Sequence, residues 1–174
     1  MQHLKSISYR GGLITFRIPA QWKEEYAADG GGSFYEDAPN TPTFRLEVIT
    51  AQAPGPLSVE ASARVLAPLG EIQSGTIESL DNGNAVLRYT QSTTEQGQPL
   101  HISYWSLAQV IPPNHARIAT FSHTLLEGQQ TEAQYAAEIE LLDREVRAAK
   151  FWPSLSTLSQ AEAASTKQPW WRFW

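Results

Sequence analysis

The chain of 174 residues contains no cysteine, which excludes disulfide bonds, thiolate metal sites and cysteine nucleophiles. Long apolar runs are missing as well. No segment approaches the about 18 apolar residues of a membrane-spanning helix, and residues 1–12 hold no apolar stretch of signal-peptide length. We therefore expect a soluble, cytoplasmic protein.

Clustered positive charge is also missing. The sequence has 13 lysines and arginines against 18 aspartates and glutamates, for a net charge of −5, and the cations are scattered. Binding to a phosphate backbone needs grouped cations. The charge pattern therefore predicts that nucleic acid is not a partner.

Recognised catalytic and cofactor motifs are absent. The chain has no G-x-S-x-G nucleophile motif. Its glycine run, Gly30–Gly32, lacks the helix and lysine that follow the glycines of a phosphate-binding loop. We expect these glycines to end a helix, where positive φ angles are needed, and we expect no cofactor.

What the chain does contain is typical of a globular domain, with 41% hydrophobic and 18% charged residues. Residues 1–153 are predicted to form a single α+β domain. Residues 154–174 are predicted to be a Ser/Ala/Gln-rich linker followed by a flexible aromatic tail.

The first half predicts strands at 13–18, 33–36 and 43–51, the last with clean alternation of apolar and charged residues. Between the first two, Pro19 suits the first position of a helix. Trp22 and Tyr26 would then share one face of that helix, four residues apart.

In the second half, a helix is expected from Ser58 to Leu66, stopped by Pro68 and Gly70. An antiparallel meander follows, because short turn-forming segments separate its apolar stretches. Its strands are expected at 72–80, 84–92, 100–111 and 115–125.

A long helix closes the domain and is expected to end at Pro153. Thr131 and Gln134 have the spacing of a capping box at its start. Apolar residues then recur at spacings of four and three, which predicts one buried stripe on this third helix.

Three segments carry a family resemblance: ITFRIP at 14–19, FRLEVITA at 44–51, and FSHTLLEG at 121–128 before the long helix. Over residues 7–152 the chain resembles the Mog1/PsbP-like group. The resemblance implies an antiparallel sheet of about six to seven strands flanked by helices. It also implies a role as an adaptor, chaperone or assembly factor.

An acidic, aromatic rim around the glycine run is the first candidate binding surface. We expect it to contact another protein, because its spacing matches no calcium-binding loop and solvated charge is commoner than a metal site. Its residues are Glu24, Glu25, Asp29, Tyr35, Glu36 and Asp37.

The aromatic end of the chain is the second candidate. Aromatic side chains dominate binding hot spots, so this segment could dock on a partner or fold back on its own domain. Membrane contact ranks behind both, because the segment is short and carries one cation. Its residues are Trp170, Trp171, Arg172, Phe173 and Trp174.

Two histidines supply the main alternative. The Pro112–Asn114 turn would pair Ile111 with His115, placing His123 opposite Ser103 and diagonal to His101. Such imidazoles could bind a metal or act as a base, although no third ligand is evident.

Tyr104 and Trp105 are adjacent in one predicted strand, so they must point to opposite faces of the sheet. One face could be core and the other a binding surface, unless helices cover both.

Taken together, the sequence favours a non-catalytic protein that binds another protein. An enzyme using the His101/His123 region and a toxin-neutralising, immunity-type protein are the alternatives.

Overall fold

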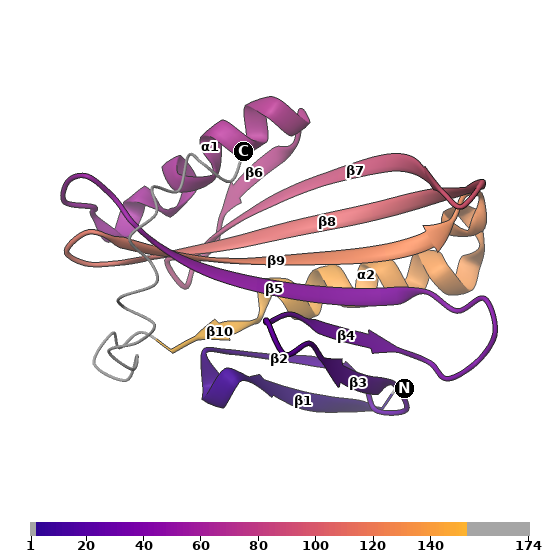
Figure 1. The fold of residues 1–174 in the computed structure, drawn as a ribbon. Helices are drawn as coiled ribbons and strands as arrows, with labels where there is room; N and C mark the ends of the chain where they lie inside the picture. The colour runs from indigo at the N-terminus through magenta and orange to yellow at the C-terminus, as the bar shows by residue number, and fades with distance from the viewer. Residues whose placement is uncertain (1–2, 153–174) are drawn as a thin grey trace.

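The computed structural model describes residues 3–152, which form two antiparallel sheets and two α-helices (Figure 1). The larger sheet has seven strands in the order β3-β4-β5-β9-β8-β7-β6. Their bounds are Lys23–Tyr26, Gly32–Tyr35, Thr43–Gln52, His115–Leu126, Gln98–Ile111, Ala85–Glu95 and Thr76–Ser79. The predicted α+β class and its sheet of six to seven strands are confirmed.

A second, three-stranded sheet was not predicted. It has the order β1-β2-β10, with bounds Leu4–Tyr9, Ile14–Pro19 and Lys150–Phe151. β2 is the expected strand at 13–18. β1 and β10 escaped prediction because both are defined by pairing with β2 rather than by a clear local pattern.

The predicted first helix is wrong. Lys23–Tyr26 forms strand β3, which pairs with β4 so that Glu24 lies opposite Phe34. Trp22 is buried in the core while Tyr26 is half exposed, so the two rings do not share a helix face. Gly30 and Gly31 still need positive φ (115° and 89°), but they do so in the turn of a β-hairpin. Pairing with β4 has overridden the helical spacing.

The second helix is longer than predicted. A short 3₁₀ turn, Val59–Ala61, leads into α1, Ser62–Gln73, which continues through Pro68. It ends at Ser74, which adopts a left-handed conformation (φ 51°). Gly70 has a packing role, because an added Cβ would lie 2.9 Å from Cδ1 of Ile77. The following strand therefore starts at Thr76 instead of residue 72.

The last helix, α2 (Ala133–Arg147), is present, but its predicted capping box is wrong. Glu132 takes the N-cap position without a side-chain bond, and the Thr131 hydroxyl donates to the carbonyl of Gly128 in the preceding 3₁₀ turn (2.8 Å). Leu142 and Val146 form the centre of the buried stripe.

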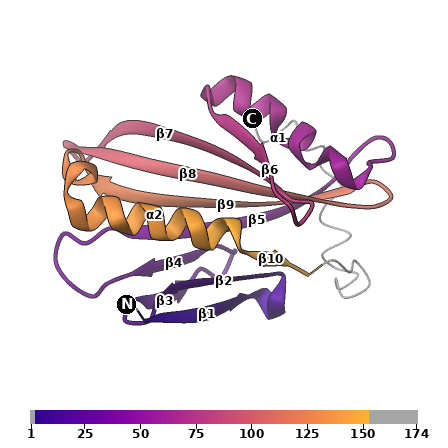
Figure 2. The ribbon, with the colours of Figure 1, turned by 180° about the vertical axis from the view of Figure 1, so that it is seen from behind.

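The inner face of the seven-stranded sheet packs against the three-stranded sheet and α2 (Figures 1 and 2). Trp105, Phe121 and Phe44 meet Phe16 of β2 and Leu142 of α2 in this main core. α1 lies on the outer face and forms a smaller core around Leu66, Leu69, Leu87 and Ile118. The three-stranded sheet and α2 thus cover much of the inner face, whereas α1 covers only part of the outer face.

Candidate functional site

The histidine pair was predicted from the strand register, and the register is confirmed: Ser103 lies opposite His123 and Ile111 opposite His115. His123 is fully buried, and its Nε2 lies 2.8 Å from Oε1 of Glu138 on α2. Among residues 3–152 no group of three or more His, Cys, Asp or Glu side chains could hold a metal ion. The contact with Glu138 instead anchors α2 to the sheet.

Two of the five acids of the predicted rim, Glu24 and Asp37, are paired with lysines. Glu24 lies 2.8 Å from Nζ of Lys5 and accepts a hydrogen bond from Tyr26 (2.7 Å). The bond from Lys5 is the main reason that the pKa of Glu24 lies below its ordinary value, and the Tyr26 hydroxyl adds to it.

The remaining rim residues are divided between local pairs and open surface. The Tyr35 hydroxyl donates to Glu25, and Asp37 pairs with Lys23 at 2.5 Å. Glu36 is exposed, and Asp29 lines a groove. The aromatic candidates, residues 170–174, lie outside the described part of the chain.

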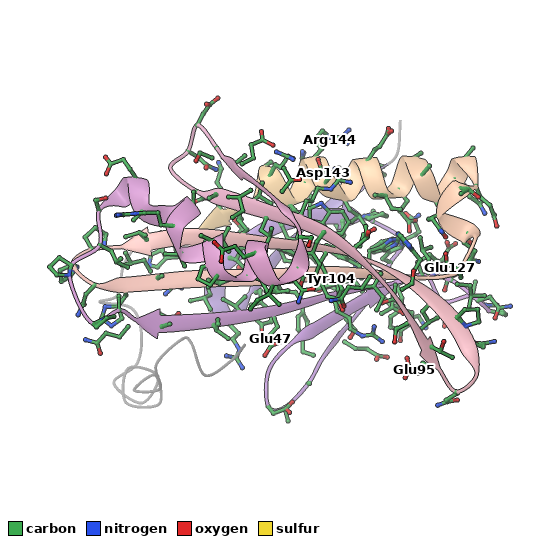
Figure 3. All side chains as sticks on the ribbon, turned by 90° about the horizontal axis from the view of Figure 1, so that it is seen from above. Glu47, Glu95, Tyr104, Glu127, Asp143 and Arg144 are labelled. Atoms are coloured by element: carbon green, nitrogen blue, oxygen red, sulfur yellow. The ribbon has the colours of Figure 1, made fainter. Side chains whose placement is uncertain are left out.

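The groove has a volume of about 630 Å³ and lies between the glycine turn, β5 and the outer face of the sheet. Tyr104 and Glu47 both line it (Figure 3). Its other charged residues are Arg10, Asp29 and Arg45, all exposed, so both signs of charge are present. We call it the hairpin groove.

The glycine turn forms one wall of the hairpin groove. The N–H of Gly31 donates to the hydroxyl of Tyr9 (2.9 Å), which holds the turn against the end of β1. At Gly30 an added Cβ would lie 2.5 Å from Nη2 of Arg10. Because Nη2 is the end of a flexible side chain, the stronger reason for glycine here is the positive φ of Gly30 (115°).

Of the residues that line the groove, the sequence had singled out Asp29 and the orientation of Tyr104, but not the cations Arg10 and Arg45. Arg45 is one of the charged residues in the alternating strand predicted at 43–51. Arg10 is distant in sequence and reaches the groove through the pairing of β1 with β2. Neither had a local signal of function.

Two stacked tyrosines extend the exposed outer face beside the groove. The rings of Tyr89 and Tyr104 lie 4.7 Å apart and 10° from parallel. Burial raises the pKa of Tyr89 to about 12, and the neighbouring Tyr104 phenol adds to the effect.

This pKa predicts a loss of stability at alkaline pH. A pKa raised in the folded state stabilises the protein fully below the unfolded value of 10.0, and the contribution disappears as pH rises from 10 toward about 12. The free energy of unfolding should therefore fall more steeply across this range in the wild type than in Tyr89→Phe. Denaturant titrations at about pH 9 and pH 11 measure the difference. Parallel curves for the two proteins would contradict the prediction.

A second, apolar pocket of about 350 Å³ lies between α1 and the loop after β5. Pro54, Pro56, Leu57, Val65 and Ile118 line it, with the exposed Arg64 among them. Its lining offers little hydrogen bonding, so it could accept an apolar side chain but not orient a polar ligand.

Comparisons with known proteins show the fold. No family model matches the sequence, and no curated protein is similar to it in sequence. One similar solved structure is LpqN, "involved in cell envelope biogenesis of Mycobacterium tuberculosis", with 11% identity and a TM-score of 0.59 over 87% of this chain and 91% of that one. The chain shares its α+β fold.

Another is a protein of Bacteroides thetaiotaomicron VPI-5482, with 19% identity and a TM-score of 0.59. The match covers 87% of this chain, which spans about half (49%) of that protein. Among the described residues, no helix is long and apolar enough to cross a membrane.

Proposed function

We propose that this protein is a non-catalytic binding protein, a small cytoplasmic adaptor, chaperone or accessory factor whose ligand is another protein. The observation that carries the proposal is the hairpin groove. It lies on the part of the outer sheet face that α1 leaves open, and it combines an aromatic ring, Tyr104, with charges of both signs.

The chemistry of the groove suits a polypeptide. Protein interfaces combine aromatic anchors and arginine with a polar rim. Tyr104 supplies the aromatic surface, while the two arginines, Arg10 and Arg45, and the two carboxylates, Asp29 and Glu47, give the lining both signs of charge. Mixed charges of this kind can pair with the backbone groups and side chains of a protein, whereas a small anion or cation would meet repulsion from one of the two pairs.

The fold adds support of a more general kind. The likeness to LpqN is consistent with membership of the Mog1/PsbP-like group, which we propose as the family of this chain. Members of that group typically bind other proteins as adaptors, chaperones or assembly factors. Function on a shared fold is set by the site, so the groove carries the argument.

A photo-crosslinking amino acid placed at Ser122, which lines the groove, tests the proposal in source cells. We expect one adduct of defined mass, and no such adduct from the control position Glu140, which is exposed on α2. The charge reversal Arg45→Glu should reduce adduct yield about tenfold, because Arg45 is the cation of the mixed-charge lining that we expect to pair with an acidic side chain of the partner.

Arg64→Glu makes the same charge change beside the apolar pocket on α1 and should leave the yield unchanged. Equal labelling from Ser122 and Glu140, or equal loss from both charge reversals, would refute binding at the groove. If the captured protein is a toxin, the immunity-type alternative becomes the specific function. The acidic chain would attract a basic partner of this kind.

A further inference from the structure

One edge of β5 is paired along only part of its length. β9 pairs with β5 from Thr43 to Gln52, but β4 pairs with it only from Thr43 to Leu46. Within residues 3–152 no strand pairs with the remaining edge, Glu47–Gln52, which we call the open edge. In Figure 1, β4 lies beside the N-terminal end of β5 and not beside its C-terminal end.

The pairing stops because the glycine turn diverts the chain. Continued pairing would set Gly31 opposite Glu47, but Gly31 and Gly30 have positive φ and return the chain to β3. The N–H of Gly31 bonds to the Tyr9 hydroxyl instead of to a strand. The hairpin groove lies at this point and is lined by Glu47, Val48 and Ile49.

An unpaired strand edge presents backbone donors and acceptors that can template another strand. Natural proteins protect such edges with lysine, proline or bulges. The open edge, EVITAQ, has no lysine or proline, and its centre is the β-branched run Val48, Ile49, Thr50. Residues of this type are enriched in paired β-strands.

We propose that the open edge of β5 binds an extended segment of the partner protein as an added antiparallel strand. This deepens the proposed function, on which it rests, by naming the form of the ligand. β3 and β4 stand beside the first half of β5 and extend the sheet by two strands, spaced about 4.8 Å apart. The space beside the open edge is therefore a notch next to the β3–β4 hairpin. It suits a single strand better than the edge of a second copy, because the β3–β4 hairpin of that copy lies in the plane of its own sheet.

The side chains around the notch define the segment further. Val48 packs toward the main core, and Ile49 packs toward α1. Successive side chains of the added strand would therefore lie alternately on the inner and the outer face of the sheet. On the inner side, Arg117 bonds both Thr50 (3.2 Å) and the carbonyl of Trp152 (2.7 Å), which brings the half-exposed Trp152 close to the open edge. On the outer side Glu47 is exposed.

The best-suited segment thus alternates apolar residues, facing Val48 and Trp152, with basic residues facing Glu47. A cation opposite Glu47 would form a favourable cross-strand pair. The net charge of −5 would attract a basic segment in the same sense.

Amide hydrogen exchange of the full chain, resolved by residue with NMR, tests this directly. The probe is a blocked peptide of alternating valine and lysine, and its control is the same peptide N-methylated at alternate residues. We expect amides of Val48–Gln52 that point away from β9 to exchange rapidly in the free protein. The probe should slow them at least about tenfold, while the methylated peptide should not, because it cannot form the ladder.

The matched variants are Glu47→Lys and Glu140→Lys, both at exposed positions. Glu47→Lys should weaken the probe about fivefold, and Glu140→Lys should not change its affinity. Protection already present at every protein concentration would mean that the chain covers its own edge. Protection that grows with concentration would mean a second copy. Either result, or no protection by the probe, overturns the proposal.

These failures are distinguishable from failure of the proposed function. If Ser122 still captures a partner while the amides of the open edge stay unprotected in that complex, the groove binds protein but not by strand addition. If no partner is captured at Ser122, the proposed function itself fails.

Discussion

Replacing Trp105 with alanine is expected to lower the free energy of unfolding by about 3–5 kcal/mol. The indole is completely buried where the two sheets and α2 meet, in contact with Phe44 (ring centroids 6.4 Å apart). Its Nε1–H also donates to Asp143 of α2 (2.8 Å). The substitution therefore removes a large apolar group, leaves a cavity and breaks a link between sheet and helix.

Denaturant titration measures this effect. One further variant isolates the hydrogen bond to Asp143, and a second serves as a control at an exposed tryptophan. Trp105→Phe keeps an aromatic ring but removes the bond to Asp143, so it should cost about 1–2 kcal/mol. Trp152→Ala removes an indole that is 52% exposed and should change stability by less than about 0.5 kcal/mol. A loss below about 1 kcal/mol for Trp105→Ala would mean that this face of the sheet is not the core.

Removing one side of the ion pair between Arg17 and Glu145 should have the second-largest effect. Glu145 is buried (2% exposed) on α2, and Arg17 of β2 bonds both its oxygens, at 2.8 and 3.2 Å. Loss of one partner from a buried pair costs about 3–5 kcal/mol. Because the Arg17 side chain is 54% exposed, solvent screens the pair, and we expect about 2 kcal/mol for Arg17→Met.

A double-mutant cycle isolates the pair. Arg17→Met/Glu145→Met should recover part of the stability lost by either single change, because no buried carboxylate is then left unpaired. Arg144→Ala is the matched control: its Nε also contacts Glu145, at 3.2 Å, but its side chain is 65% exposed. It should cost less than about 0.5 kcal/mol. Strict additivity of the two methionine substitutions would contradict an energetic link between β2 and α2.

The meander was predictable because its signals are local. The turn at Pro112–Asn114 specifies which residues of β8 and β9 pair, and a register shift of one residue would turn every side chain to the other face. The long helix was equally clear from its apolar stripe. Its start was not, because Thr131 bonds the local carbonyl of Gly128 instead of capping α2.

The β3–β4 hairpin shows where local patterns fail. Trp22 and Tyr26 have helical spacing, and the following glycines suit a helix end. What decides the outcome is the pairing of β3 with β4 and of β4 with β5, which the residues of β3 do not encode by themselves. The pairing of the acidic rim could not be predicted for the same reason: its contacts with Lys5 and Lys23 depend on this hairpin and on β1.

By itself the sequence determined the α+β class, the long antiparallel meander and the opposite orientations of Tyr104 and Trp105, because these follow from periodicity and turn chemistry within short segments. Only the tertiary structure decided which face is covered and where a ligand could bind. The hairpin groove joins Arg10, Asp29, Glu47 and Tyr104 from four parts of the chain. It exists because β4 stops pairing with β5 at Leu46. The position of such a site depends on where the pairing between distant strands ends. The sequence of a single segment therefore cannot predict it.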